Sequence, residues 1–452
     1  MATQELELPV APSELVSRCA SEPFVCALDG GDARSWGIGR ALLGFGPRAT
    51  LCVSASGDAL MRDGHAHRWH GDPFELLDRF CAVAARAGAP EPFGGGVVAA
   101  LSYDLRHWVE RLPARAHEDV GLPVLHAAAY DWLLSYSYVD RRYQLASADR
   151  SPAELREMAA RLAALAAQPA PSGSVRRPPC AAPDVSEAEY LATVHAALDY
   201  IAAGDIYQVN LARRFSVTHP PAPATLFVTL QRQHPMPFAA YVDGGDFVLV
   251  SNSPECFLTL DGDGLATFPI KGTRPRGADP PADRALAEQL EVDPKERAEH
   301  VMIVDLERSD LGRACRTGTV RVDEFARVHS FPSLHHLVSK VSGRLRPGTR
   351  LADVLRATFP GGSITGAPKI RAMEIIDELE PGCRGFYTGA IGFIGCDGRA
   401  VFNLAIRTAV ATPGKFTYHA GGGIVADSVP AREYDETILK AQAFLAALTA
   451  AA

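Results

Sequence analysis

Several segments of the chain combine a helix-start signal with apolar residues at helical spacing. Ser151 precedes Pro152 and an alanine-rich run, which predicts a helix that continues to about residue 168. Ser186 and Glu189 form a capping-box pattern, and apolar residues then recur three or four positions apart. Further helices are expected over residues 293–308, 368–379 and 430–448.

Other segments alternate apolar and polar residues, which is the period of a half-buried strand. In IYQVNLARRF (206–215), Val209 and Leu211 fall on one face and Gln208 and Asn210 on the other. Similar strand signals occur in FGGGVVAALSYD (93–104), HAAAYDWLLSYSYVD (126–140), FAAYVD (238–243), DFVLVS (246–251), GFYTGAIGF (385–393), AVFNLAIRTAV (400–410) and FTYHAGGGIV (416–425). Because strands come in adjacent pairs with helices interspersed singly, we expect an α+β fold with large antiparallel sheets, not a doubly wound parallel sheet.

The stretch QPAPSGSVRRPPCAAPDV (168–185) interrupts these patterns. It is rich in proline, serine and alanine and has no periodicity, which is typical of a linker or a long surface loop. We therefore divide the chain into an N-terminal region of residues 1–167, a linker of residues 168–185 and a C-terminal region of residues 186–448.

Composition narrows the class of protein. The 452 residues are 47% hydrophobic and 22% charged, an ordinary globular mixture that excludes wholesale disorder. The formal net charge of −8 argues against nucleic-acid binding. The chain has no run of 18 apolar residues, so no membrane span is expected. The N-terminus has no signal-peptide pattern, and nine cysteines without a C-x-x-C favour neither a disulfide framework nor a zinc site. These features predict a cytoplasmic protein.

Two pairs of glutamates are the first candidates for chemistry. Glu296 and Glu299 lie three residues apart in one predicted helix, and Glu433 and Glu436 lie three apart in the last one, with Lys440 on the same face. Like charges at this spacing cost about 0.2–0.5 kcal/mol per pair unless something neutralises them. Mg²⁺ would do so, since it takes one or two carboxylates and keeps its waters. Solvated helix faces show the same pattern, so both interpretations stay open.

The segment PIKGTRPRG (269–277) is the second candidate. It is a predicted loop in which Lys271, Arg274 and Arg276 place three cations within six residues. It is suited to binding an anion, or to a lysine whose pKa is lowered by its cationic neighbours so that it acts as a nucleophile. An ordinary surface loop is equally compatible. Just upstream, Glu255 in SNSPECF is either a candidate acid or a turn carboxylate.

Glycine-rich segments are the third feature, in FPGGSITGAPK (359–369) and HAGGGIV (419–425). Neither has the Walker or G-x-G-x-x-G spacing, but glycines after a strand let backbone N–H groups approach an anionic ligand. The first segment is also compatible with a plain turn into a helix. Arg407 stands among apolar neighbours, which favours a carboxylate partner. Tyr387 and His336, each taken alone, are more typical of structure than of function.

In this order, these segments resemble the chorismate-utilising enzymes, which comprise component I of anthranilate synthase and of aminodeoxychorismate synthase, and the isochorismate and salicylate synthases. The N-terminal region resembles them more weakly, in GGVVAALSYDLRHWVERLP (95–113) and LPVLHAAAYDWLLSYSY (122–138). The other motifs cover almost all of residues 187–445 and are specific jointly. They are GDIYQVNLAR (204–213), SPECF (253–257), PIKGTRPRG, DPKERAEHVMIVDLERSDLGR (293–313), HHLVSKVSG (335–343), FPGGSITGAPKIRAMEIIDELEP (359–381), FYTGAIGF (386–393), NLAIRT (403–408) and HAGGGIVADSVPAREYDETILKA (419–441).

Two positions discriminate within this family. Lys271 in PIKGT is typical of aminodeoxychorismate synthases, whereas anthranilate synthases carry alanine there. Isochorismate and salicylate synthases carry a water-activating lysine where this chain has Gln208. The resemblance therefore points to the branch that forms 4-amino-4-deoxychorismate for para-aminobenzoate and folate. It also implies the fold, a four-layer α/β/β/α arrangement of large antiparallel sheets packed against each other with helices outside.

The resemblance implies a mechanism. Glu255 would protonate the departing hydroxyl at ring carbon 4 of chorismate while neutral Lys271 attacks ring carbon 2. Ammonia would then add at carbon 4 and expel the lysine. His336 would assist near the ring.

The resemblance also implies how the substrate is held. Mg²⁺, bound by Glu299 and Glu436 and supported by Glu296 and Glu433, would hold the ring carboxylate. The remaining substrate contacts it implies are Gly272, Thr273, Ser363 and Gln208, then Gly421, Gly423 and Lys440 at the ring carboxylate, and Tyr387 and Arg407 at the enolpyruvyl carboxylate.

Partners follow from the same resemblance. No segment matches a glutaminase with a Cys-His-Glu set, so a separate glutamine amidotransferase subunit is expected to supply ammonia in a heterodimer. The family also implies a tryptophan site in the N-terminal region, where LDGG (28–31) has Gly30 in place of the serine that relatives tend to carry.

Two alternative functions stay open. Anthranilate synthase component I would aromatise the ring with loss of pyruvate. A catalytically silent subunit would bind chorismate or an amidotransferase without turnover. The four residues Glu255, Lys271, Glu299 and Glu436 speak against the silent subunit, since it has no chemical need for all of them.

Overall fold

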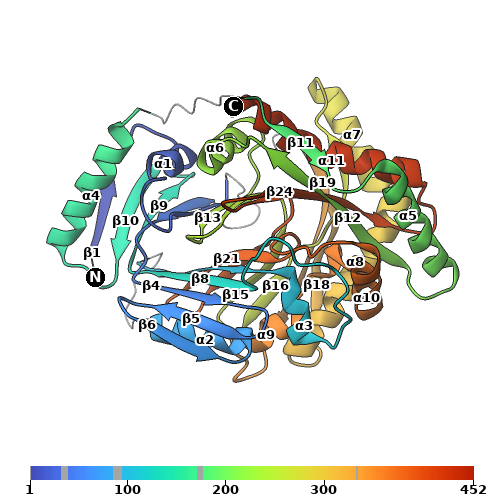
Figure 1. Cartoon of the computed structure of the whole chain (residues 1–452), viewed down its shortest axis with the longest axis horizontal. Helices are drawn as coiled ribbons and strands as arrows, with labels where there is room; N and C mark the ends of the chain where they lie inside the picture. Colours follow the sequence, from blue (N-terminus) through green and yellow to red (C-terminus); the bar gives the residue numbers. More distant parts are fainter. Residues whose placement is uncertain (1, 32–38, 85–93, 170–176, 332–333) are drawn as a thin grey trace.

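Two large sheets dominate the computed structural model (Figure 1). It describes residues 2–31, 39–84, 94–169, 177–331 and 334–452. Within these residues the strands form two 12-stranded sheets, and the neighbouring strands pair antiparallel. This arrangement confirms the α+β class expected from paired strand signals.

The first sheet runs across the middle of Figure 1. Its strands, in spatial order, are β1 (Ala2–Leu6), β10 (Arg142–Ser147), β9 (Trp132–Ser137), β3 (Arg40–Gly44), β2 (Cys26–Asp29), β13 (Phe238–Asp243), β14 (Val248–Ser253), β23 (Thr408–Ala411), β24 (Phe416–Ile424), β12 (Gln208–Thr218) and β11 (Cys180–Pro183), with β20 (Gly366–Ala367) also on β12.

The second sheet lies below the first in that view. Its order is β17 (Ile270–Pro275), β19 (Leu334–Arg344), β16 (Gly264–Thr267), β15 (Cys256–Asp261), β22 (Ala400–Leu404), β21 (Ala390–Gly395), β7 (Gly96–Leu101), β8 (Leu125–Tyr130), β4 (Ala49–Val53), β5 (Asp58–Arg62) and β6 (Ala66–His70), with β18 (Arg321–Ser330) also on β19.

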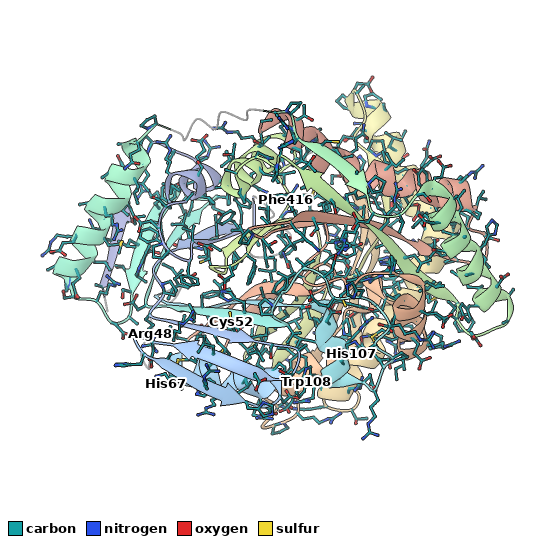
Figure 2. The ribbon with its side chains drawn as sticks, viewed as in Figure 1. Arg48, Cys52, His67, His107, Trp108 and Phe416 are labelled. Carbon is teal, nitrogen blue, oxygen red and sulfur yellow. The ribbon has the colours of Figure 1, made fainter. Side chains whose placement is uncertain are left out.

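Much of the packing between the two sheets lies in a single large apolar cluster. Leu249 and Val410 contribute to it from the first sheet, and Val98, Ala128 and Ile391 from the second. Figure 2, which labels Cys52 in the second sheet and Phe416 in the first, shows side chains filling the space between the two ribbons.

Helices cover the outer faces. Those packed on the first sheet are α1 (Pro12–Arg18), α4 (Pro152–Ala167), α6 (Pro223–Gln233) and α11 (Pro430–Ala450). Those grouped around the second sheet and the far end of β12 are α2 (Pro73–Ala84), α3 (Arg106–Val109), α5 (Glu187–Ala202), α7 (Pro280–Val292), α8 (Pro294–Ala314), α9 (Leu351–Thr358) and α10 (Lys369–Leu379). The expected four layers are therefore present.

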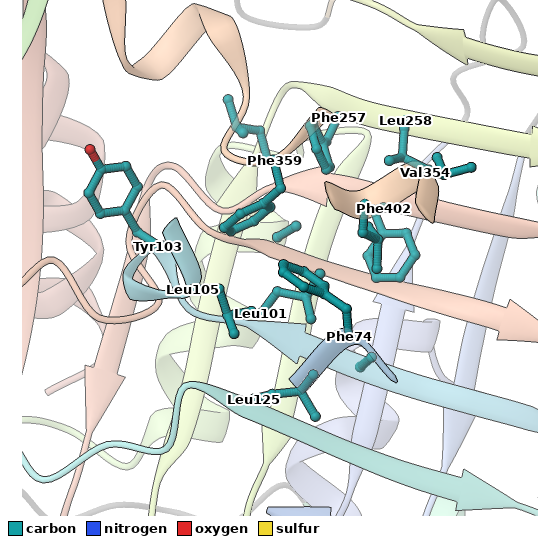
Figure 3. Packing of buried hydrophobic residues seen from close by; sticks show 14 of the residues in the cluster. Phe74, Leu101, Tyr103, Leu105, Leu125, Phe257, Leu258, Val354, Phe359 and Phe402 are labelled. Carbon is teal, nitrogen blue, oxygen red and sulfur yellow. The ribbon is translucent and has the colours of Figure 1, made fainter. Parts of the chain in front are cut away.

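Figure 3 shows the core on the outer face of the second sheet. Phe74 of α2 packs edge-on to Phe359, and Phe359 packs edge-on to Phe257 at the start of β15. Phe359 is the residue that follows α9, so this aromatic row fixes the start of the glycine-rich loop described below.

The helix-start signals agree with the structure. Ser151 and Ser186 each accept a hydrogen bond from the backbone N–H of the glutamate three residues on, and the carboxylate of that glutamate accepts one from the backbone N–H of the serine. Asp293 caps α8 by accepting from Lys295 N and Glu296 N.

Both sheets draw strands from both sides of the expected linker. β7 and β8 lie at the centre of the second sheet beside β21, and β2 and β3 lie beside β13 in the first. Residues 170–176 of the linker lie outside the described residues. The linker prediction was wrong for Cys180–Pro183, which form β11, because the backbone of this short segment pairs with the free edge of β12.

Two further expectations need correction. PIKGTRPRG is not a loop, since Ile270–Pro275 form edge strand β17 on β19, and its proline and glycines act as a bulge and strand end. AVFNLAIRTAV is not one strand, since Ala400–Leu404 and Thr408–Ala411 belong to different sheets. Alternation cannot reveal this crossover, which occurs at Arg407, where φ is +51°.

Candidate active site

Glu255, Lys271 and Ser363 form the centre of the site. Ser363, in the short 3₁₀ turn Gly362–Ile364, donates from Oγ to Glu255 Oε1 at 2.7 Å. The carbonyl of the same serine accepts from Lys271 Nζ at 3.3 Å. One residue of the glycine-rich loop thus contacts both the candidate acid and the candidate nucleophile.

Burial changes the protonation of both groups. Burial raises the pKa of Glu255 to about 7, against the opposing effects of the Ser363 hydrogen bond and the Lys271 charge. Burial also lowers the pKa of Lys271, and the Lys440 ammonium lowers it further. A carboxyl with a raised pKa beside an amine with a lowered pKa is the pairing that acid catalysis and nucleophilic attack require.

The cations expected to tune Lys271 do not do so. Arg274 pairs with Asp293 at 2.8 Å and with Glu296 at 3.3 Å, and Arg276 pairs with Asp283 at 2.6 Å. The cation that lowers the pKa of Lys271 is Lys440 of α11, which lies 169 residues further along the chain. Only the fold brings it near.

His336 lies on β19, directly across from β17. A glycine in the left-handed region, Gly272 with φ +75°, forms the bulge between Lys271 and Thr273. His336 Nδ1 lies 3.0 Å from Thr273 Oγ1 and 3.4 Å from the Gly272 carbonyl. Burial, reinforced by Arg407, lowers the pKa of His336 to about 3, so the ring is neutral. Its buried Nε2 has no partner in the described residues.

The four metal-ligand candidates lie on two helices that face each other. Glu296 and Glu299 come from α8, and Glu433 and Glu436 from α11. Burial raises the pKa of Glu299, and the charges of Glu296 and Glu436 add to that rise. Burial acts on Glu436 in the same sense, but the surrounding lysine charges, of which Lys440 at 2.6 Å contributes most, together outweigh it and lower its pKa. Glu299 therefore repels Glu296 on its own helix and Glu436 on the other helix.

These carboxylates fit a hard cation. A Cβ built on Gly422 would lie 3.3 Å from Glu436 Oε1 and 3.6 Å from Glu433 Oε2, so the glycine keeps that space open. Within the described residues, no three His, Cys, Asp or Glu side chains already converge as a metal cluster. Mg²⁺ needs only one or two carboxylates besides water and substrate oxygens, so the arrangement is compatible with it.

The glycine-rich strand β24 contributes differently from expectation. Gly421 accepts from Lys440 Nζ at 3.1 Å through its carbonyl. A Cβ on Gly423 would lie 2.4 Å from Gln208 Nε2, so this glycine makes room for Gln208. Neither amide atom of the buried Gln208 has a partner in the described chain. Gly422, which was not singled out from sequence, is the glycine that faces the carboxylates.

Arg407 lies near His336, since its charge acts on the pKa of that histidine. The expected carboxylate partner of Arg407 does not exist among the described residues, where its guanidinium has only a 3.6 Å contact with Met236 Sδ. Burial lowers the pKa of Arg407. Tyr387 stacks on His419 with ring centroids 4.9 Å apart, and Tyr418 interacts electrostatically with both Tyr387 and Arg407. An arginine without an internal anion is suited to a ligand carboxylate.

The LDGG segment lies apart from these residues. Leu28, Asp29 and Gly30 line a cavity of about 600 Å³ together with Pro237 and Phe238. Asp29 accepts from Tyr138 Oη at 2.7 Å. The volume is that of a small-molecule site, and its occupancy by tryptophan stays a prediction.

Comparison with known proteins agrees with the geometry. The model of the family described as chorismate binding enzyme matches residues 25–446. Aminodeoxychorismate synthase component 1 of Klebsiella aerogenes is 40% identical over 440 residues, 97% of this chain and 96% of that protein. Anthranilate synthase component 1 of Streptomyces coelicolor is 42% identical over 397 residues, 84% and 78% of the two chains.

A solved structure matches the fold as well. Anthranilate synthase component I from Streptococcus pneumoniae aligns with a TM-score of 0.80 at 30% identity, covering 90% of this chain and 92% of that one. In the described residues, none of the helices has the length and apolar character needed to cross a bilayer.

Proposed function

The chain belongs to the chorismate binding enzymes, and on that premise we propose that it catalyses the aminodeoxychorismate synthase reaction. The observation that supports this most directly is the meeting of Lys271 and Glu255 on Ser363. A buried amine beside a buried acid is what a covalent substitution at the chorismate ring requires.

The proposed reaction has two displacements. The neutral amine of Lys271 attacks ring carbon 2, both ring double bonds shift by one position, and the hydroxyl at carbon 4 leaves as water with the proton of Glu255. Ammonia then bonds to carbon 4, both double bonds shift back, and the lysine leaves carbon 2 as the amine. Glu255 recovers a proton from the nitrogen groups, so chorismate and ammonia give 4-amino-4-deoxychorismate and water.

Binding residues hold the dianionic substrate at both ends. We propose that Arg407 and Tyr387 take the enolpyruvyl carboxylate, because Arg407 has no internal carboxylate among the described residues. Glu299 and Glu436, with Glu296 and Glu433, would hold Mg²⁺ at the ring carboxylate. When bound, this ion neutralises the carboxylates on both protein and substrate. Gly421 and Lys440 border the same end, and Gln208 presents its unpartnered amide beside Gly423.

Ammonia is proposed to come from a separate glutamine amidotransferase subunit. The purified chain should then use an ammonium salt but not glutamine. Glutamine-dependent turnover by the pure single chain would contradict this part of the proposal.

Product identity tests the reaction itself. The purified chain is incubated with chorismate, Mg²⁺ and an ammonium salt, and the products are separated and identified by mass spectrometry. Aminodeoxychorismate, absent with Lys271→Ala, supports the proposal. Chorismate binding without turnover, even after an amidotransferase is added, would support a silent subunit instead.

Anthranilate synthase activity is the second candidate. It is favoured by the 42% identity to the Streptomyces coelicolor protein of that name, which is similar to the identity with the aminodeoxychorismate synthase relative. Anthranilate and pyruvate as products would establish it and would mean that Lys271 is a poor guide within this family.

A further inference from the structure

Glu307 is a buried carboxylate that the proposed reaction does not use. It lies on α8, two turns beyond Glu299, and only 3% of its surface is exposed. Its Oε1 accepts from Gly362 N at 3.0 Å, and its Oε2 lies 3.2 Å from Thr267 Oγ1. It therefore connects the second sheet to the loop that carries Ser363.

The nearest cation has no hydrogen bond left for Glu307. Lys369 Nζ has three N–H donors. It bonds to Asp310 Oδ2, to the Pro360 carbonyl at 2.7 Å and to the Thr358 carbonyl at 3.3 Å. In the described part of the chain, no cation bonds to Glu307. An ionised Glu307 would be a buried charge supported by one backbone N–H, which is costly.

The threonine on the other side cannot supply the missing donor. Thr267 has a single hydroxyl proton, and its Oγ1 lies 2.7 Å from the Phe257 carbonyl, which can only accept. With that proton committed, Thr267 offers Glu307 a lone pair. The 3.2 Å contact is a hydrogen bond only if Glu307 Oε2 carries the proton and donates it.

Glu307 binds the loop of Gly362 and Ser363, which contacts both candidate catalytic residues. A Cβ on Gly362 would lie 3.0 Å from Glu307 Oε1, so backbone and carboxyl are in direct contact. The next residue, Ser363, contacts both Glu255 and Lys271. Phe257 and Phe359, seen together in Figure 3, complete the support beneath this loop.

We propose that Glu307 is a positioning residue that stays protonated in the working enzyme and, as a neutral acid, fixes the Gly362–Ser363 loop against Glu255 and Lys271. This role rests on the proposed function, because it assigns Ser363 to the acid and the nucleophile. On one side, the protonated carboxyl of Glu307 donates a hydrogen bond to Thr267, whose hydroxyl donates to the Phe257 carbonyl. On the other side, the backbone N–H of Gly362 donates to Glu307.

The charges that face Glu307 agree with a neutral state. Burial, with a further contribution from the Asp310 carboxylate, raises its pKa to about 7. Lys369 opposes the rise, while Glu255, across the loop, adds to it. Ionisation of Glu307 as the pH rises through 7 would place a lone pair against the Thr267 lone pair and loosen the loop.

Two substitutions of similar shape separate this role from simple packing. In Glu307→Gln the amide donates to Thr267 and the carbonyl accepts from Gly362, so turnover of chorismate should stay within about twofold of wild type. In Glu307→Leu both bonds are lost, and kcat should fall by about 10–100-fold with little change in KM, since misplacement of catalytic groups costs about that much. If the leucine variant does not fold, the pH profile and the infrared spectrum of the glutamine variant still test the proposal.

The pH dependence of kcat distinguishes a protonated Glu307 from a side chain that only fills space. The basic limb of kcat in wild type should depend on two protons, those of Glu255 and Glu307, and in Glu307→Gln on one. A protonated-carboxyl band should also disappear from the infrared spectrum of Glu307→Gln at pH 6.

Glu380 is the matched control. It is also buried, but its carboxylate pairs with Arg384 at 2.6 Å. Glu380→Gln should remove no protonated-carboxyl band and should destabilise the protein. Equal loss of activity in the glutamine and leucine variants of Glu307, an unchanged basic limb, or an unchanged infrared band would each overturn the proposal. The infrared result and the variant ratios do not depend on which product forms, so failure of the proposed function would be recognised separately.

Discussion

Two glutamates of the candidate active site, Glu255 and Glu436, have opposite surroundings. Glu255 is 6% exposed, accepts from Ser363 Oγ and from a backbone N–H, and lies near Lys271, whose pKa is lowered by burial. Glu436, on α11, is half-buried and lies 2.6 Å from the Lys440 ammonium. Burial raises the pKa of Glu255, whereas the lysine charges around Glu436, of which Lys440 contributes most, together outweigh burial and lower its pKa.

The difference shows how one side chain serves two chemical roles. A carboxyl that is dry and close to few charges keeps its proton near neutral pH and can donate it. A carboxyl that is half-solvated beside a lysine stays ionised and can bind a cation. The following substitutions test this division, beginning with the largest expected effect.

Lys271→Ala should abolish both the covalent adduct and turnover, with kcat lower by more than about a thousandfold, as for other enzymes that lose a nucleophile. Intact-mass measurement after mixing with chorismate checks it. A chorismate adduct that persists in the variant would show that Lys271 is not the nucleophile.

Glu255→Gln should lower kcat by about 10²–10⁴-fold, because a general acid contributes on that scale. Wild-type activity should fall as the pH rises through about 7, where Glu255 loses its proton. The same raised pKa has a stability consequence. Wild type binds a proton that the unfolded chain releases above about 4.5, so it loses stability from pH 4.5 to 7.

Denaturant unfolding at two pH values checks that consequence. Relative to wild type, Glu255→Gln should be more stable at pH 8 than at pH 5. A stability difference independent of pH would mean that Glu255 is ionised throughout.

Glu436→Gln should raise the Mg²⁺ concentration needed for half-maximal activity by at least about 10–100-fold, the loss seen when supporting ligand contacts are removed. Magnesium titration of initial rates checks it, with the exposed Glu157 of α4 changed to Gln as control. An unchanged magnesium requirement would remove Glu436 from the metal-binding set.

Lys440→Met should have the smallest effect, a few-fold loss of adduct formation at pH 7. Lys440 lowers the pKa of Lys271, so its removal leaves more of the nucleophile protonated and moves the acidic limb to higher pH. Lys440→Arg keeps the charge and should leave that limb in place. If methionine and arginine give the same pH profile, Lys440 does not tune Lys271.

Local sequence patterns predicted many of the elements of this fold. Capping boxes at Ser186 and Ser151 and the Asp293-Pro294 signal mark helix starts, because the hydrogen bonds that form them span only three residues. Alternation predicted strands such as β12, β13, β14 and β24 for the same reason, but it did not predict β4, β5, β16 or β19. Alternation could not separate β22 from β23, and it could not show that PIKGT forms a strand. Both features depend on which distant strand the segment pairs with.

The types of residue at the site were also predictable from motifs, and their surroundings were not. The sequence by itself determined which carboxylates, lysines and glycines this chain has and how far apart they lie along each element. The tertiary structure alone decided that Lys440 and not Arg274 acts on Lys271, that Gly422 faces the glutamates, and that Glu307 lies beneath the Ser363 loop. The physical reason is that burial and charge act through space, and the groups responsible come from strands and helices far apart in the chain.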